Sequence, residues 1–254
     1  AASLVEAGGQ QFLVDCGRGV LMRLAAAGSS MGQVAAVFLT HLHSDHITDF
    51  NDALTTHWIS SFQPTPLRVI GPPGTQAFVD ANLSMLTEDV GYRLAHHDDL
   101  TWSPDVRVTE LVEGVAYEEG GVRVVAAPTD HRPVHPTVGF RFEHDGSSIV
   151  CAGDTVPCEG LDRLCEGADV YVQTVLRRSL VEQVPSPRFQ EILDYHSSLQ
   201  DAGETAARGA VGTLLLTHLI PSPVPGTEHE WVAEAAEHFD GRIVAAEDLT
   251  VVEA

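Results

Sequence analysis

The sequence predicts an α/β fold, and three observations carry that prediction. Short apolar runs rich in β-branched residues alternate along the chain with segments whose apolar residues recur at helical spacing. Polar residues capable of chemistry follow directly on several of these runs. The 254 residues, 44% of them hydrophobic, are enough to bury a sizeable core. Since no repeat, linker or low-complexity segment interrupts them, we expect one domain over residues 1–254.

The elements follow from these patterns in chain order. Strands are predicted over 3–7, 11–15, 34–39, 67–70, 106–112, 115–118, 121–127, 137–143, 148–153, 168–173, 212–217, 242–246 and 249–252. Helices are predicted over 20–27, 47–60, 75–86, 158–166, 198–209 and 228–240. The stretches 87–104 and 174–195 show neither pattern, so we expect irregular structure there. Because the chain goes straight into a strand, we expect it to begin inside the fold, with an N-terminal strand missing.

The composition limits the classes of function. There are 36 acidic residues against 14 basic ones, all of them Arg, and the formal net charge is −22. Such a chain repels polyanions at long range, which argues against tight, nonspecific binding of nucleic acid. A codon bias toward Ala, Gly, Asp and Arg explains the composition at least as well. No apolar run has the length of a membrane span, so we expect no membrane partner.

The cysteines and the N-terminus bear on the compartment. The four cysteines, Cys16, Cys151, Cys158 and Cys165, lack the spacing of a structural zinc site. Free thiols are typical of intracellular proteins. With no signal peptide visible, we expect a cytoplasmic protein.

A histidine-rich loop, His41-Leu42-His43-Ser44-Asp45-His46, directly follows the apolar run 34–39. Residues at the end of a buried strand converge on a small volume, and three imidazoles with a carboxylate are the ligands that zinc accepts. The alternative is a solvated surface loop. The strand before it favours a metal site.

Other donors recur at the ends of predicted strands. His131, Asp154 and His218 each follow such a run or lie one residue past it. Together with the loop they make seven donors: His41, His43, Asp45, His46, His131, Asp154 and His218. Seven ligands are too many for one tetrahedral zinc and suit two zinc ions that share a bridging carboxylate. Asp15, at the end of another strand, is a candidate to orient a metal-bound histidine or to cap the next helix.

At this point the chain resembles the metallo-β-lactamase superfamily over essentially its whole length. The H-x-H-x-D-H motif is complete, and Asp15, His131, Asp154 and His218 lie in motifs of the expected order. The resemblance implies a four-layer αββα sandwich. It also implies that His41, His43 and His131 hold one zinc, that Asp45, His46 and His218 hold the other, and that Asp154 bridges them.

Within the superfamily, Asp194-Tyr195-His196-Ser197-Ser198 looks like the His-Ser-Thr motif of the ribonuclease Z branch. The resemblance implies that His196 serves catalysis and does not bind metal. Two features depart from that branch. Asp154 follows His131 after only 23 residues, which leaves no room for the projecting arm of the tRNA-processing members. Gln173 also stands where many members have a His-Glu pair, so His196 must be oriented by another group.

Several further residues have competing interpretations. His135 rivals His131, but His131 directly follows the strand and precedes Pro133 in the family layout. We expect His57 to be an ordinary histidine and the pair His96-His97 to lie in a solvated loop. Arg177 and Arg178 are candidates to contact phosphates or are simply solvated.

These residues predict a phosphodiesterase. Two zinc ions would lower the pKa of a shared water, and the resulting hydroxide would attack phosphorus. Asp45 would accept the proton of the water, and His196 would protonate the departing oxygen. The expected substrate is precursor tRNA, cut at the 3′ trailer by a homodimer. The alternatives are a hydrolase of small phosphodiesters, aryl sulfates or carboxyl esters, and a degenerate binding module, which the complete ligand set disfavours.

Overall fold

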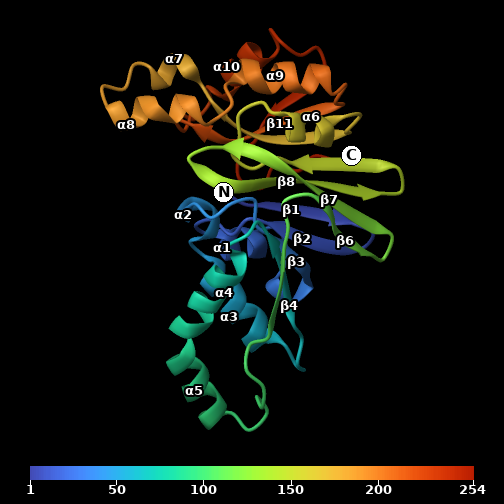
Figure 1. Cartoon of the computed structure of the whole chain (residues 1–254), viewed down its shortest axis with the longest axis vertical. Helices are drawn as coiled ribbons and strands as arrows, with labels where there is room; N and C mark the ends of the chain where they lie inside the picture. The colour runs from blue at the N-terminus through green and yellow to red at the C-terminus, as the bar shows by residue number, and fades with distance from the viewer. The chain divides into compact units, whose positions relative to one another are not determined.

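The computed structural model describes residues 1–254 and contains two compact units, residues 1–111 and 112–254. Each unit has one β-sheet with helices packed on it, so the α/β class is confirmed (Figure 1). The single domain expected from the sequence stays a prediction. No helix combines the length and the apolar character needed to span a membrane.

Unit 1 is a five-stranded sheet in the order β1-β2-β3-β4-β5, where only β1 and β2 are antiparallel. Its strands are β1 (Ser3–Ala7), β2 (Gln10–Val14), β3 (Val34–Phe38), β4 (Leu67–Gly71) and β5 (Val106–Glu110). Its helices are α1 (Val20–Ala26), η1 (Met31–Gln33), α2 (Ser44–Ile47), α3 (Phe50–Ser60), α4 (Thr75–Met85) and α5 (Thr87–His96). Residues of α1, α3 and α4 bury their apolar side chains against β2, β3 and β4.

Unit 2 is a seven-stranded sheet in the order β12-β11-β10-β9-β8-β7-β6. Its strands are β6 (Gly114–Glu119), β7 (Val122–His131), β8 (Val134–His144), β9 (Ser147–Cys151), β10 (Val170–Leu176), β11 (Thr213–Ile220) and β12 (Arg242–Ala245). Its helices are α6 (Glu159–Cys165), α7 (Arg178–Val181), α8 (Pro187–Gln190), η2 (Glu191–Asp194), α9 (Leu199–Arg208) and α10 (Glu228–Ala235). The core of this unit lies between the sheet and α6, α9 and α10.

Strand direction brings functional residues to one edge within each unit. In unit 2, β9, β10 and β11 are parallel, and β7 runs in the same direction because β8 is antiparallel to both β7 and β9. In unit 1, β2 and β3 are parallel neighbours. The residues that follow these strands therefore collect at the carboxyl edge of their own sheet.

Three local expectations were wrong. Residues 87–96 form α5, although none of its side chains is fully buried. Acidic residues in its first turn, basic ones in its last, and the Asp89–Arg93 pair at 2.8 Å stabilise it locally. The segment 174–195, expected to be irregular, extends β10 and forms α7, α8 and η2, whereas residues 249–252 form no strand.

Two helical glycines, one tightly packed and one in open space, provide a test of how α6 packs. A Cβ at Gly160 of α6 would lie 1.9 Å from the carbonyl oxygen of Pro128, whereas one at Gly91 of α5 would meet nothing within 4 Å. We expect Gly160→Ala to lower the free energy of unfolding by about 1–3 kcal/mol, because the strand or the helix must shift. Gly91→Ala should raise it by about 0.5–1 kcal/mol through helix propensity. Chemical denaturation measures both, and equal signs would contradict the packing of α6 on β7.

Candidate metal centre

The histidine-rich loop of unit 1 leaves the carboxyl end of β3 and packs its imidazoles together. The side chains of His41 and His46 are buried, and their ring centroids lie 4.1 Å apart. The ring of His43 lies 5.0 Å from that of His41. The loop then enters the short helix α2, which carries Asp45 and His46. The predicted loop is therefore a compact cluster of donors and not a solvated turn.

The buried carboxylate of Asp15 organises this cluster from the end of the neighbouring strand β2. It accepts hydrogen bonds from the backbone N–H of Thr40 at 2.8 Å, the hydroxyl of Thr40 at 2.9 Å and Nδ1 of His46 at 2.7 Å. Three donors compensate a carboxylate that is only 4% exposed. Asp15 therefore orients a histidine, which is one of the two roles predicted for it. It does not cap α1, whose N-cap residue is Gly19.

These hydrogen bonds select the nitrogen that each histidine can offer to a metal. Nδ1 of His46 donates to a carboxylate, so in the neutral ring the proton is on Nδ1 and the lone pair is on Nε2. The hydroxyl of Thr40 donates to Asp15 and so accepts from Nδ1 of His41 at 3.0 Å. One carboxylate thus fixes His46 directly and His41 through Thr40, an arrangement typical of metal-bound histidines. The role of Thr40 was missed from the sequence.

The remaining polar groups of the unit 1 cluster differ in exposure. The carboxylate of Asp45 is 53% exposed, and its Oδ2 lies 3.8 Å from Nε2 of His46. Cys16, which follows Asp15, is completely buried. Burial, reinforced by the charges of Asp15 and Asp49, raises the pKa of its thiol and makes it a packing group. All four cysteines are free thiols, as expected.

Unit 2 places its donors at the carboxyl edge of its sheet. His131 is the last residue of β7, Asp154 lies just beyond β9, and His218 lies near the end of β11. Nε2 of His131 lies 3.9 Å from Oδ2 of Asp154, and both side chains are buried. The backbone carbonyl of Tyr195 accepts a hydrogen bond of 2.7 Å from Nδ1 of His131, which again leaves Nε2 as the nitrogen that could bind a metal.

His218 is aimed by an irregularity in its strand. The register of β10 against β11 shifts between Thr174 and Leu176, opposite this part of β11. His218 has a φ of 46°, in the left-handed region that non-glycine residues rarely occupy. Bulges of this kind redirect a side chain next to a functional site. A ligand atom of His218 lies within 4.8 Å of one of Asp154.

His196 lies beside the donors of unit 2 and is held at both nitrogens. Its Nδ1 donates to the backbone carbonyl of Ile192 at 3.1 Å, and its Nε2 lies 3.2 Å from Oδ2 of Asp154. The group that orients His196 is therefore a backbone carbonyl of η2. Gln173, at the position of the absent His-Glu pair, is buried and bonded to Tyr171 and Thr174 instead.

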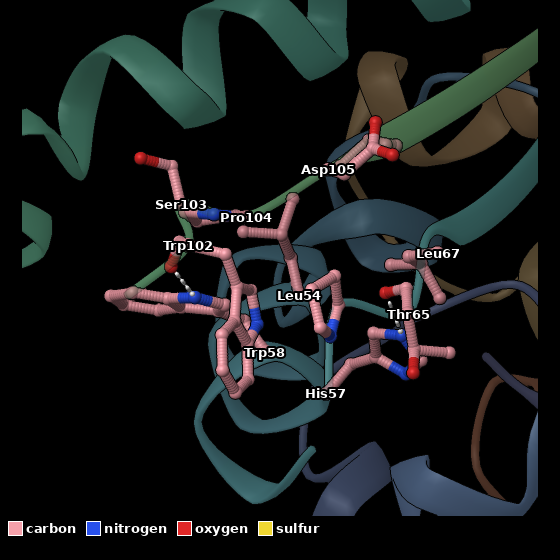
Figure 2. A pocket seen from close by; sticks show the side chains of 11 residues that line it. Leu54, His57, Trp58, Thr65, Leu67, Trp102, Ser103, Pro104 and Asp105 are labelled. Atoms are coloured by element: carbon pink, nitrogen blue, oxygen red, sulfur yellow. Dashed lines mark hydrogen bonds between the residues drawn. The ribbon is translucent and has the colours of Figure 1, made fainter. Parts of the chain in front are cut away.

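The competing histidines are not part of the donor groups. His135 is exposed, whereas His131 is buried among donors. His96 and His97 are exposed at the end of α5. His57 lines a pocket of about 100 Å³ beside Trp58 and Trp102, where its Nε2 lies 3.2 Å from the carbonyl oxygen of Thr65 (Figure 2). Its Nδ1 lies 3.2 Å from the carbonyl oxygen of Met31.

The two arginines predicted to contact phosphates, Arg177 and Arg178, differ in their ion pairs. Arg177 is bound by Glu230 at 2.5 Å and Glu234 at 2.9 Å, so its guanidinium holds β10 to α10. Arg178 is half-exposed and lies 3.8 Å from Glu182. Arg177 is therefore a structural residue, and only Arg178 keeps an accessible charge.

The chemistry of the donor set fits a metal ion. The donors are imidazoles and carboxylates, which suit zinc and similar divalent ions. Carboxylate, hydroxyl and carbonyl groups hold Nδ1 of His41, His46 and His131, so that each presents Nε2. The histidine and aspartate residues at each sheet edge are therefore chemically suited to bind a metal ion.

Removal of the Asp15 carboxylate tests this arrangement. We expect Asp15→Ala to weaken zinc binding about 10- to 100-fold, because His46 and Thr40 lose the group that orients them. Competition with a chromophoric chelator measures the affinity. Asp49→Ala is the matched control, since Asp49 accepts a hydrogen bond from Gly19 in the same region but contacts no histidine through its carboxylate. Equal affinities for the two variants would contradict the proposed role of Asp15.

Comparison with known proteins agrees with the fold. Residues 10–219 match the family model of the β-lactamase superfamily domain. The chain is 54% identical to a ribonuclease Z of Mycolicibacterium gilvum, with 98% of this chain and 87% of the relative covered. It is 53% identical to a ribonuclease Z of Mycobacterium bovis, with 99% and 91% covered.

Solved structures show the same fold at lower identity. The metallo-β-lactamase-fold protein YhfI of Bacillus subtilis matches with a TM-score of 0.71 at 21% identity, covering 98% of this chain and 88% of that one. Human short-form tRNase Z matches with a TM-score of 0.72 at 22% identity, covering 100% and 92%. The chain therefore belongs to the β-lactamase superfamily and, within it, to the ribonuclease Z family.

Proposed function

We propose that the chain is a dinuclear zinc phosphodiesterase that removes the 3′ trailer from precursor tRNA. The observation that carries the proposal is the match to curated ribonuclease Z proteins at 53–54% identity over 98–99% of the chain. In this proposal His41, His43 and His131 hold one zinc, and Asp45, His46 and His218 hold the other. Asp154 bridges the two ions. The imidazole and carboxylate donors at the two sheet edges support this assignment.

Each residue has a definite task in the proposed reaction. Bound zinc ions would lower the pKa of water and offset the negative charge that grows on the phosphoryl oxygens. Asp45 is the proton acceptor, because its carboxylate is half-exposed and open to an approaching water. His196 would give the Nε2 proton of its doubly protonated ring to the departing oxygen. The Ile192 carbonyl keeps a proton on Nδ1 and so fixes which nitrogen faces the substrate.

Replacement of His196 tests its role. We expect His196→Ala to reduce turnover of precursor tRNA by about 10²- to 10⁴-fold, the usual contribution of a general acid. Its zinc content should stay the same, because His196 is not one of the proposed ligands. His135→Ala is the matched control, since this nearby histidine is exposed. Normal turnover in His196→Ala, or loss of zinc, would contradict the assignment.

A second function, hydrolysis of small phosphodiesters, aryl sulfates or carboxyl esters, is favoured by two observations. The net charge of −22 opposes the approach of a polyanion. The interval between His131 and Asp154 is filled by the β8–β9 hairpin, which leaves no arm to hold an RNA. The same metal-binding residues would serve either function.

A comparison of substrates separates the two functions. The zinc-loaded protein is assayed on precursor tRNA and on bis(p-nitrophenyl) phosphate at about 50 and about 200 mM salt. We expect cleavage at the 3′ trailer that weakens steeply with salt, because protein–phosphate contacts release counterions. Rapid hydrolysis of the small diester with no cleavage of precursor tRNA would reject the tRNA-processing function.

Assembly and location belong to the same proposal. We infer a homodimer in the cytoplasm from the resemblance to the ribonuclease Z branch. Light scattering at several protein concentrations measures the assembly, and a monomer throughout would reject the homodimer.

A further inference from the structure

The arginines are the only permanent cations of this chain, so they limit how it could hold an RNA. There are 14 of them and no lysine. Half or more of the hydrogen bonds at a protein–nucleic acid interface commonly go to phosphate and sugar, many of them from arginine. A guanidinium that already binds carboxylates serves this purpose poorly, because the phosphate must displace them.

Most arginines of unit 2 are bound in this way. Six form close ion pairs with carboxylates: Arg123, Arg132, Arg141, Arg163, Arg177 and Arg208. Arg178 has a longer contact with Glu182. The two others, Arg188 and Arg242, are exposed and make no ion pair.

Arg188 and Arg242 lie at different places in unit 2. Arg188 is on α8, which continues directly into η2 and then His196. Arg242 begins β12 and pairs with Thr213 at the start of the parallel strand β11, whereas His218 lies near the other end of β11. Arg188 is thus the arginine without an ion pair on the segment that leads to the proposed general acid.

The segment that carries Arg188 is well anchored. Nε2 of Gln190 donates to the carbonyl oxygens of Val181 and Val184, each at 2.8 Å, which ties α8 to α7 (Figure 1). The following η2 accepts the hydrogen bond from His196 at Ile192. A contact made by Arg188 would therefore be held at a constant place relative to His196, which a flexible loop could not provide.

The local charge also suits a phosphate. The segment 177–195 contains three arginines and three acidic residues, Glu182, Glu191 and Asp194, and is neutral in a chain of net charge −22. At physiological salt the Debye length is about 8 Å, so a phosphate at Arg188 responds mainly to charges within that distance.

We propose that Arg188 binds a phosphate of the RNA substrate and positions the scissile bond at His196. This inference rests on the proposed function, because it requires an RNA substrate. An arginine fork matches the two oxygens of a phosphate and forms a charge-assisted pair of hydrogen bonds. Arg188 thereby supplies an RNA contact from the segment that leads to the general acid.

The test compares Arg188→Ala with Arg242→Ala in the zinc-loaded full chain, using precursor tRNA. We expect Arg188→Ala to raise the KM and the Kd about tenfold, the loss expected for one charged hydrogen bond, with the larger effect on KM and not on kcat. The slope of log Kd against log salt should become shallower by about 0.7–0.9, the value for one phosphate contact. Arg188→Lys should recover part of the affinity, and Arg242→Ala should bind as the wild type does.

Each outcome decides the question. Equal Kd values and salt slopes for Arg188→Ala and Arg242→Ala, in a wild-type protein that cleaves precursor tRNA, overturn the role of Arg188 and leave the proposed function intact. A wild-type protein that does not cleave precursor tRNA overturns the proposed function and the role of Arg188 together. A fall in kcat without a change in Kd also overturns the phosphate contact. Because Arg188 is exposed and unpaired, thermal unfolding should show all three variants to be folded.

Discussion

The orientation of the histidine donors in unit 1 depends on one buried carboxylate, that of Asp15. Asp15 receives three hydrogen bonds, two from Thr40 and one from His46, and Thr40 passes its effect on to His41. A carboxylate that is 4% exposed is costly unless it is compensated, and these donors are held in place only when β2 and β3 are in register. The pairing of these two parallel strands therefore also orients the imidazoles of His41 and His46. A nearby divalent cation would further offset the negative charge of Asp15.

In unit 2, backbone carbonyl groups orient the histidines. Carbonyl oxygens of Tyr195 and Ile192 receive the Nδ1 protons of His131 and His196. The segment that supplies them is fixed in turn, because Leu176 donates to Ser197 and Ser197 donates to Thr155. The capping box of Ser198 and Asp201 then begins α9 immediately after His196. His196 therefore lies between two anchored segments, and the Ile192 carbonyl orients it.

The sequence predicted the donor residues much better than the groups that orient them. The loop 41–46 and the donors at strand ends could be found because each is local and follows a recognisable apolar run. Asp15 was also found, since it ends a strand. The carbonyl groups of Ile192 and Tyr195 carry no side-chain pattern, and the left-handed φ of His218 depends on a register shift between two strands. The ion pair of Arg177 joins residues 53 and 57 positions apart, which no local pattern could indicate.

The acidic composition is a weaker argument against an RNA substrate than it first suggests. Net charge governs nonspecific attraction at long range, but salt screens that field within about 8–10 Å. Specific positioning depends instead on which guanidinium groups remain available at short range. Ion pairs occupy most arginines of unit 2 and remove them from this role, while Arg188 stays exposed on the segment that leads to His196. A chain of net charge −22 can therefore reject polyanions in general and still hold one phosphate where the chemistry needs it.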